Sequence, residues 1–209
     1  MTDEVSRFHN ITALSLYIDT HIIDAPDEAA VFLRRLMKEG WISLSRTDVM
    51  GTELARAPDE KRADLAEASA SYPESYGPMV WNQSRWGSSV WGSEEDHSRL
   101  NDTFAILFPN VNRATARGNH LRDVMHVSTA IRYGGFGFVT RERRLLNKAE
   151  QIAERFHSFQ ILSPEQANSE AMARVRGVRE LHRLEPHRGS LPSWPVESDV
   201  PSGSAETTQ

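Results

Sequence analysis

The sequence contains no cysteine among its 209 residues. This absence excludes disulfides, thiolate zinc sites, iron–sulfur ligation and cysteine nucleophiles. No apolar run approaches the roughly 18 residues of a membrane-spanning helix, and the polar start MTDEVSRFHN lacks the pattern of a secretion signal. We therefore expect no membrane partner and a location in the reducing cytoplasm.

The sequence also lacks an excess of positive charge. Its 24 Lys and Arg face 29 Asp and Glu, which gives a formal net charge of −5. Proteins that bind nucleic acid through general electrostatic attraction are usually basic, so this class is disfavoured. An acidic site that recruits cations remains open.

Strand-like and helix-like segments alternate along the chain, which predicts an α/β fold with a mostly parallel sheet. Short apolar runs predict strands over residues 13–19, 41–45, 136–140 and 159–162. Caps and apolar periodicity predict helices over residues 26–40, 47–53, 58–70, 94–108, 119–133, 142–156 and 164–184.

The same patterns predict how the chain is divided. We expect one domain over residues 13–163, preceded by a loose lead-in over 1–12 and interrupted by an irregular, Trp-rich excursion over 71–93. A helix over 164–185 follows, and the Pro-, Ser- and Gly-rich stretch 186–209 is expected to be disordered.

Four carboxylates fall where the carboxyl ends of parallel strands would meet: Asp19, Glu53, Asp123 and Glu142. Clustered carboxylates repel one another unless a cation joins them, and oxygen ligands without cysteine favour Mg²⁺ or Mn²⁺. A solvated or helix-capping role is about equally compatible with each acid taken alone. Asp123 and Glu142 suit the first turns of the helices expected there.

Several ordered motifs resemble those of the PIN-domain nucleases. Leu16-Tyr-Ile-Asp19-Thr20 is similar to the first strand of that family and its closing acid, and Glu53-Leu54 is similar to its second acidic position. Asp123-Val-Met-His126-Val-Ser-Thr-Ala130, followed by Gly135-Phe-Gly-Phe-Val-Thr140-Arg-Glu142, resembles the family's third acid, glycine turn, short strand and Thr-x-acid pattern. The chain departs from the pattern at Glu142, where Asp is usual, at His21, where Asn is common, and in its long middle segment.

The resemblance implies a PIN-like three-layer sandwich and a Mg²⁺- or Mn²⁺-dependent hydrolase that cleaves single-stranded RNA. Its VapC-like members are toxins of toxin–antitoxin pairs, so an antitoxin partner and a homodimer are expected. By the resemblance, the four acids hold the metal and Thr140 hydrogen-bonds to the site. Arg122, Arg141 and His21 are candidates for contact with the RNA substrate.

Two alternatives come from other functional classes. A catalytically silent PIN-like domain would bind RNA or protein without cleaving, and would bind divalent metal weakly or not at all. A phosphatase would normally carry a second Asp two residues after Asp19, where this chain has His21.

Two further features have competing interpretations. We favour a structural role for His126 over that of a proton shuttle. For Trp81, Trp86 and Trp91 we favour packing at a core edge or an oligomer contact over stacking on bases.

Overall fold

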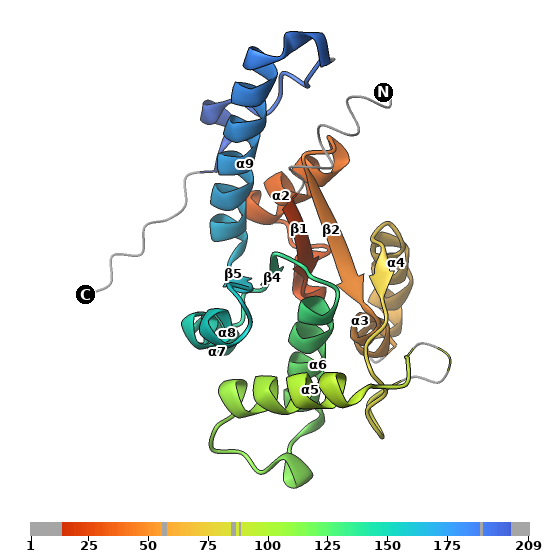
Figure 1. Ribbon diagram of the computed structural model, residues 1–209. Coiled ribbons are helices and arrows are strands. Elements are labelled where there is room, and N and C mark those ends of the chain that lie inside the picture. Colours follow the sequence, from red (N-terminus) through yellow and green to blue (C-terminus); the bar gives the residue numbers. More distant parts are fainter. Residues whose placement is uncertain (1–13, 56–57, 85–86, 88, 189, 202–209) are drawn as a thin grey trace, which may run out of the picture. The chain divides into compact units, whose positions relative to one another are not determined.

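The computed structural model describes residues 14–55, 58–84, 87, 89–188 and 190–201 (Figure 1). The predicted lead-in over residues 1–12 lies outside them. The chain divides into two compact units. The sheet unit comprises Ser15–Asp24 and Leu44–Leu162. The described residues of the other unit are Leu14, Ala25–Ser43, 163–188 and 190–201; we call it the α2–α9 unit after its helices α2 (Glu28–Lys38) and α9 (Pro164–Leu184). This division cuts across the predicted domain of residues 13–163, which stays a prediction.

A five-stranded parallel sheet is the centre of the fold, which confirms the predicted α/β class and four of the strands. Its strand order is β3-β2-β1-β4-β5. Leu16 is in register with Gly137, and Gly137 is in register with Gln160. The strands are β1 (Leu14–Ile18), β2 (Ile42–Thr47), β3 (Glu74–Ser75), β4 (Gly137–Val139) and β5 (Gln160–Leu162).

Strand β3 is absent from the sequence prediction. It consists of two polar residues, Glu74 and Ser75, and therefore has no apolar pattern from which a strand could be predicted. It is held at the sheet edge by pairing with Arg46 and Thr47 of β2 and by an ion pair of 3.3 Å between Arg46 Nη2 and Glu74 Oε2. Tertiary pairing therefore decides this strand, not local propensity.

Helices flank the sheet. In the sheet unit, α5 packs across α6, and α6 also contacts β4 (Figure 1). The helices of this unit are α3 (Asp48–Leu54), α4 (Asp59–Ala70), α5 (Glu94–Leu107), α6 (Gly118–Arg132), α7 (Arg143–Leu146) and α8 (Ala149–Arg155), with 3₁₀ turns η1 (Thr20–Ile22) and η2 (Arg113–Thr115).

Two helix boundaries differ from the prediction. The single helix expected over residues 142–156 is two short helices, because the chain turns at Asn147 and Lys148 between α7 and α8. Helix α6 begins at Gly118 with Arg117 as its N-cap, so Asp123 lies in the second turn instead of the first. The expected end of α6 is confirmed, since Gly134 adopts the left-handed conformation with φ +67°.

The α2–α9 unit consists mainly of two helices, α2 (Glu28–Lys38) and α9 (Pro164–Leu184), which lie side by side (Figure 1). Asn168 Nδ2 of α9 donates to the Ala29 carbonyl of α2, 2.9 Å away. Met172, Val175 and Val178, spaced three residues apart on α9, are buried, whereas Leu181 and Leu184 further along the helix are exposed.

The segment after α9 is predicted from the sequence to be disordered, but residues 186–188 and 190–201, which the structure describes, have defined contacts. It contains the 3₁₀ turns η3 (Pro186–Arg188) and η4 (Glu197–Asp199). The Trp194 ring lies 5.2 Å from that of Phe32, and the Trp194 carbonyl accepts a hydrogen bond of 2.9 Å from Trp41 Nε1. A single large aromatic residue supplies the apolar surface that the composition of this segment conceals.

Within the described ranges, no helix combines the length and the hydropathy that crossing a bilayer requires.

Candidate active site

The candidate site lies where the strand order reverses. Strands β2 and β4 flank β1 on opposite sides, although β2 follows β1 in the chain and β4 comes much later. Asp19 directly follows β1 and Thr140 directly follows β4. Ligands of parallel α/β sheets gather at this kind of switch point, outside the carboxyl ends of the strands.

Asp19 and Thr140 are joined across the switch point. The Thr140 hydroxyl donates to Asp19 Oδ2 over 2.6 Å, and the Asp19 backbone N–H donates to the Val139 carbonyl over 2.9 Å. Asp19 is only 7% exposed. Burial raises the pKa of Asp19 above its ordinary value, while the charge of His126 and the Thr140 hydroxyl oppose the rise.

A cavity of about 500 Å³ brings the four predicted carboxylates together, and we call it the carboxylate cavity. It is lined by Asp19, Thr20, His21, Asp24, Glu53, Leu54, Lys61, Leu65, Arg122, Asp123 and Glu142. Of the predicted substrate contacts, His21 and Arg122 line it. Arg141 is exposed and is not among its lining residues. Thr140 is fully buried behind Asp19.

Glu53, in the last turn of α3, is the carboxylate with the most positive surroundings. It accepts a hydrogen bond from the Thr20 hydroxyl, its Oε2 lies 3.3 Å from His126 Nε2, and its Oε1 lies 3.4 Å from Arg122 Nε. Burial alone would raise the pKa of Glu53, but His126, Thr20 and Arg122 outweigh it and lower that pKa to about 2. Glu53 is therefore ionised at neutral pH.

His126 orients Glu53 from inside the protein. Its ring is 2% exposed, and its Nδ1 lies 2.6 Å from the Thr47 hydroxyl. Burial opposes protonation of the ring, but the neighbouring Glu53, Asp19 and Asp123 carboxylates raise the pKa of His126. The two hydrogen-bond partners agree with the structural role favoured from the sequence.

Asp123 and Glu142 share one cation. Arg144 Nη2 lies 2.7 Å from Asp123 Oδ2 and 2.8 Å from Glu142 Oε2. Burial, followed by the charge of Glu142, raises the pKa of Asp123 to about 7 even though Arg144 opposes the rise. Burial and the Glu142 charge thus outweigh Arg144, and the Asp123 carboxyl is only partly ionised at neutral pH.

The donor chemistry of the cavity suits a hard divalent cation. Four carboxylates from separate chain segments converge, and burial, which raises the pKa values of Asp19 and Asp123, disfavours their charged forms unless a cation such as Mg²⁺ or Mn²⁺ lies beside them. Across the described residues, however, no three His, Asp or Glu side chains are already placed to hold an ion. A cation bound by Asp123 and Glu142 would have to displace Arg144.

Sequence reasoning missed three residues of this site. Arg144 is one of three arginines around Glu142, and no pattern distinguishes it from Arg141 or Arg143. Lys61 of α4 and Asp24, which follows η1, reach the cavity from segments that carry no motif. Only the tertiary arrangement brings them to the cavity.

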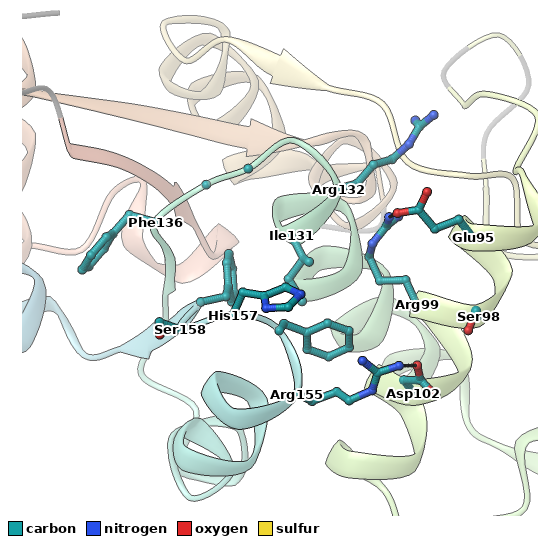
Figure 2. A pocket seen from close by; sticks show the side chains of 14 residues that line it. Glu95, Ser98, Arg99, Asp102, Ile131, Arg132, Phe136, Arg155, His157 and Ser158 are labelled. Atoms are coloured by element: carbon teal, nitrogen blue, oxygen red, sulfur yellow. Dashed lines mark hydrogen bonds and ion pairs between the residues drawn. The ribbon is translucent and has the colours of Figure 1, made fainter. Parts of the chain in front are cut away.

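A second pocket of the sheet unit lies before the amino ends of β4 and β5, and we call it the arginine pocket (Figure 2). Its volume is about 630 Å³. Its arginines are paired with acids: Arg155 Nη2 lies 2.5 Å from Asp102 Oδ2, Arg99 Nη2 lies 2.6 Å from Glu95 Oε1, and Arg132 Nε lies 3.0 Å from Asp96 Oδ1. None of the residues predicted from the sequence to form the site lines it.

No family model and no curated protein matches the chain. Among solved structures, the chain is similar to the crystal structure of VapBC2 from Rickettsia felis bound to a DNA fragment from their promoter. The identity is 13%, the TM-score is 0.41, and the match covers 71% of this chain and 97% of that one.

Proposed function

We propose that this chain is a Mg²⁺- or Mn²⁺-dependent endoribonuclease that hydrolyses phosphodiester bonds of single-stranded RNA in the carboxylate cavity. The observation that carries the proposal is the convergence of Asp19, Glu53, Asp123 and Glu142 in one cavity at the switch point of the sheet. The motifs around these four residues are those that resemble the PIN-domain nucleases.

The roles of the chain's own groups follow from their contacts. The Thr140 hydroxyl fixes the orientation of Asp19, and His126 together with Thr20 fixes that of Glu53. Arg122 and His21 lie on the cavity wall, where they would bind phosphate oxygens of the substrate. A divalent cation, when bound, would supply Lewis-acid activation of water and neutralise charge on the phosphoryl group.

A catalytically silent PIN-like domain is the second candidate. The observation in its favour is Arg144, which already bridges Asp123 and Glu142 in the position of a resident cation. Such a domain would bind RNA or protein and would not respond to divalent metal. Metal affinity therefore separates the two candidates.

The resemblance also leads us to propose that the chain is the toxin of a toxin–antitoxin pair and forms a homodimer. An inhibitory antitoxin would act by covering the cavity wall at His21 and Arg122. Light scattering of the purified chain measures the homodimer. Loss of RNA cleavage on adding the candidate antitoxin measures the toxin–antitoxin pair.

The test of the activity is cleavage of end-labelled single-stranded RNA by the full chain in Mg²⁺, in Mn²⁺ and in EDTA. Asp19→Asn keeps the size of the side chain and removes one charge, and we expect it to lower the rate by at least ~100-fold. Glu150→Gln is the matched control, because Glu150 is an exposed acid of α8 outside the cavity. Full metal-dependent cleavage by Asp19→Asn would contradict the assignment and favour the silent domain.

A further inference from the structure

The sheet unit exposes an unusual set of aromatic side chains. Every large hydrophobic residue that is exposed among its described residues is aromatic: Tyr76, Trp81, Tyr133 and Trp91. Trp81 is 75% exposed and Trp91 is 85% exposed, so neither indole packs at a core edge, which is one of the two roles favoured from the sequence. The other favoured role, an oligomer contact, stays a prediction. Trp86 lies outside the described residues. An indole left in water forgoes a large burial energy, which points to a role in contact with another molecule.

The loop that carries Trp81 and Trp91 is fixed at its base. The Gly77 N–H donates to Asp48 Oδ1 over 3.0 Å, and the Val90 N–H donates to the Gly77 carbonyl over 3.0 Å. A Cβ on Gly77 would lie 2.3 Å from Thr129 Oγ1, so the backbone lies directly against α6. The two tryptophans are therefore held on an anchored base and need little ordering to bind.

Both tryptophans follow one closing bridge of this loop. Pro78 and Val90 form a parallel bridge, and the Met79 N–H donates to the Val90 carbonyl over 2.8 Å. Trp91 comes one residue after the bridge and Trp81 three residues after it. Trp81 begins a turn, in which the Gln83 N–H donates to the Val80 carbonyl, so the two indoles flank the same bridge on two separate segments of the loop.

The loop follows α6 toward the carboxylate cavity. It contacts Thr129 through Gly77, and it reaches the first residue of α6, where a Cβ on Gly118 would lie 3.2 Å from Gln83 Oε1 and 3.2 Å from Arg122 Nη1. Arg122 lines the cavity. Gln83, two residues after Trp81, and the cavity residue Arg122 thus lie against the same backbone atoms.

The charge of this region distinguishes RNA from a protein partner. Residues 75–93 and 103–122 contain no Asp or Glu, although the chain as a whole has 29 acids and a net charge of −5. Three arginines of the described residues lie in these two stretches: Arg113, Arg117 and Arg122. The acids Glu94 and Glu95 follow Trp91 at the start of α5, whereas Arg113 and Arg117 are exposed before and at the start of α6. Aromatic side chains together with these arginines match the stacked bases and phosphates of a single strand.

We propose that Trp81 and Trp91 form a base-stacking platform for single-stranded RNA that leads into the carboxylate cavity. This inference rests on the proposed ribonuclease function. Each indole stacks on one unpaired base, largely independently of its sequence, and the neighbouring arginines bind the phosphates between them. Bases within a duplex are stacked on one another, so the platform selects single strands.

The test is fluorescence anisotropy of a labelled single-stranded RNA of about 12 nucleotides, a length suited to such sites, with the full chain in EDTA so that no cleavage occurs. We expect Trp81→Ala and Trp91→Ala each to weaken binding about ten-fold. Trp81→Phe should keep most of the affinity because it keeps an aromatic face. Affinity for a duplex of the same sequence should not change in either alanine variant.

Leu184→Ala is the matched control, because Leu184 is 68% exposed on α9 and apolar but lies in the other unit. It should bind RNA like wild type. Wild-type RNA affinity in both Trp→Ala variants would overturn the platform. The same result together with a lower assembly mass by light scattering would assign the two indoles to a protein contact instead.

Cleavage by Asp19→Asn separates failure of the platform from failure of the proposed function. If the Trp→Ala variants bind normally while Asp19→Asn loses cleavage, the platform is wrong and the ribonuclease stands. If the Trp→Ala variants lose binding while Asp19→Asn cleaves like wild type, the platform stands and the cavity is not the active site.

Discussion

The arginine pocket and the carboxylate cavity of the sheet unit differ in whether their charged side chains are paired with opposite charges. The larger one, the arginine pocket, pairs Arg99 with Glu95 and Arg155 with Asp102 (Figure 2). Its Arg132 is paired with Asp96. The smaller one, the carboxylate cavity, leaves Asp19 and Asp123 with raised pKa values, because burial and neighbouring acids outweigh the available cations. Volume therefore does not identify the candidate site, whereas uncompensated buried charge does.

The two sites also differ in what their charges contribute to the stability of the fold. Ion pairs such as Arg155–Asp102, with side chains 55% and 33% exposed, are worth little in water. Buried acids that repel one another destabilise the folded state until a cation or a proton relieves them. The carboxylate cavity thus carries a cost that the arginine pocket does not, and that cost is expected where a protein holds a metal.

The largest expected effect is on cleavage. Asp19→Asn and Asp123→Asn should each lower RNA cleavage by at least ~100-fold, and the double variant should be little worse than either, because groups that serve one metal act as a unit. Single-turnover rates with labelled RNA measure this. Independent, multiplicative losses would indicate that Asp19 and Asp123 serve different sites.

A smaller effect, on metal affinity, is expected when the guanidinium of Arg144 is removed. Arg144→Gln frees Asp123 and Glu142 and should raise the Mg²⁺ affinity about ten-fold, since one competing positive charge is lost. The matched control is Arg155→Gln in the arginine pocket, which should leave the Mg²⁺ affinity unchanged. Isothermal titration calorimetry gives both affinities, and an unchanged value for Arg144→Gln would show that Arg144 and the metal do not compete.

How far the sequence predicts the site can be judged from these residues. Asp19, Glu53, Asp123 and Glu142 could be predicted because each follows a strand or sits in a motif of fixed spacing. Arg144 could not, because the contact between its guanidinium and Asp123 joins positions 21 residues apart across the fold. The raised pKa of Asp123 also depends on that packing, because burial is its main cause.

The fold shows the same limit. Strands β1 and β4 are evident in the sequence because they are mostly buried runs of apolar residues, and β2 is evident because Ile42 and Leu44 alternate with partly exposed serines. The two-residue β3 and the break between α7 and α8 are set by tertiary pairing and packing, which no local pattern encodes. Trp194 and Trp81 are the same residue type in polar surroundings, yet only the structure reveals that Trp194 packs on Phe32 while Trp81 faces solvent.

Stability should depend on pH through Asp123. Because its pKa is raised to about 7 from an ordinary 3.8, the folded protein binds more protons than the unfolded chain between these values, and its stability falls as pH rises through that window. The effect is on the order of a few kcal/mol at most. Thermal unfolding in EDTA at a series of pH values should show that stability declines less steeply with rising pH in Asp123→Asn than in wild type. Equal slopes of stability against pH would contradict the raised pKa of Asp123.

The smallest effect is expected in the arginine pocket. Asp102→Asn removes the partner of Arg155 and should lower the free energy of unfolding by less than ~1 kcal/mol, because both side chains are partly exposed. RNA cleavage should stay within about two-fold of wild type, since the pocket lies outside the proposed site. Chemical denaturation and the cleavage assay provide the two values, and a large loss of cleavage would move the active site to this pocket.

The central claim is that the carboxylate cavity, and not the arginine pocket, holds a divalent cation. Titration of Mn²⁺ into the full chain, followed by the electron paramagnetic resonance signal of the free ion, tests it most directly. We predict saturable binding by wild type and by Asp102→Asn, and binding at least ~10-fold weaker in Asp123→Asn. Equal Mn²⁺ affinity in Asp123→Asn and wild type, or no saturable binding by wild type, would contradict the account.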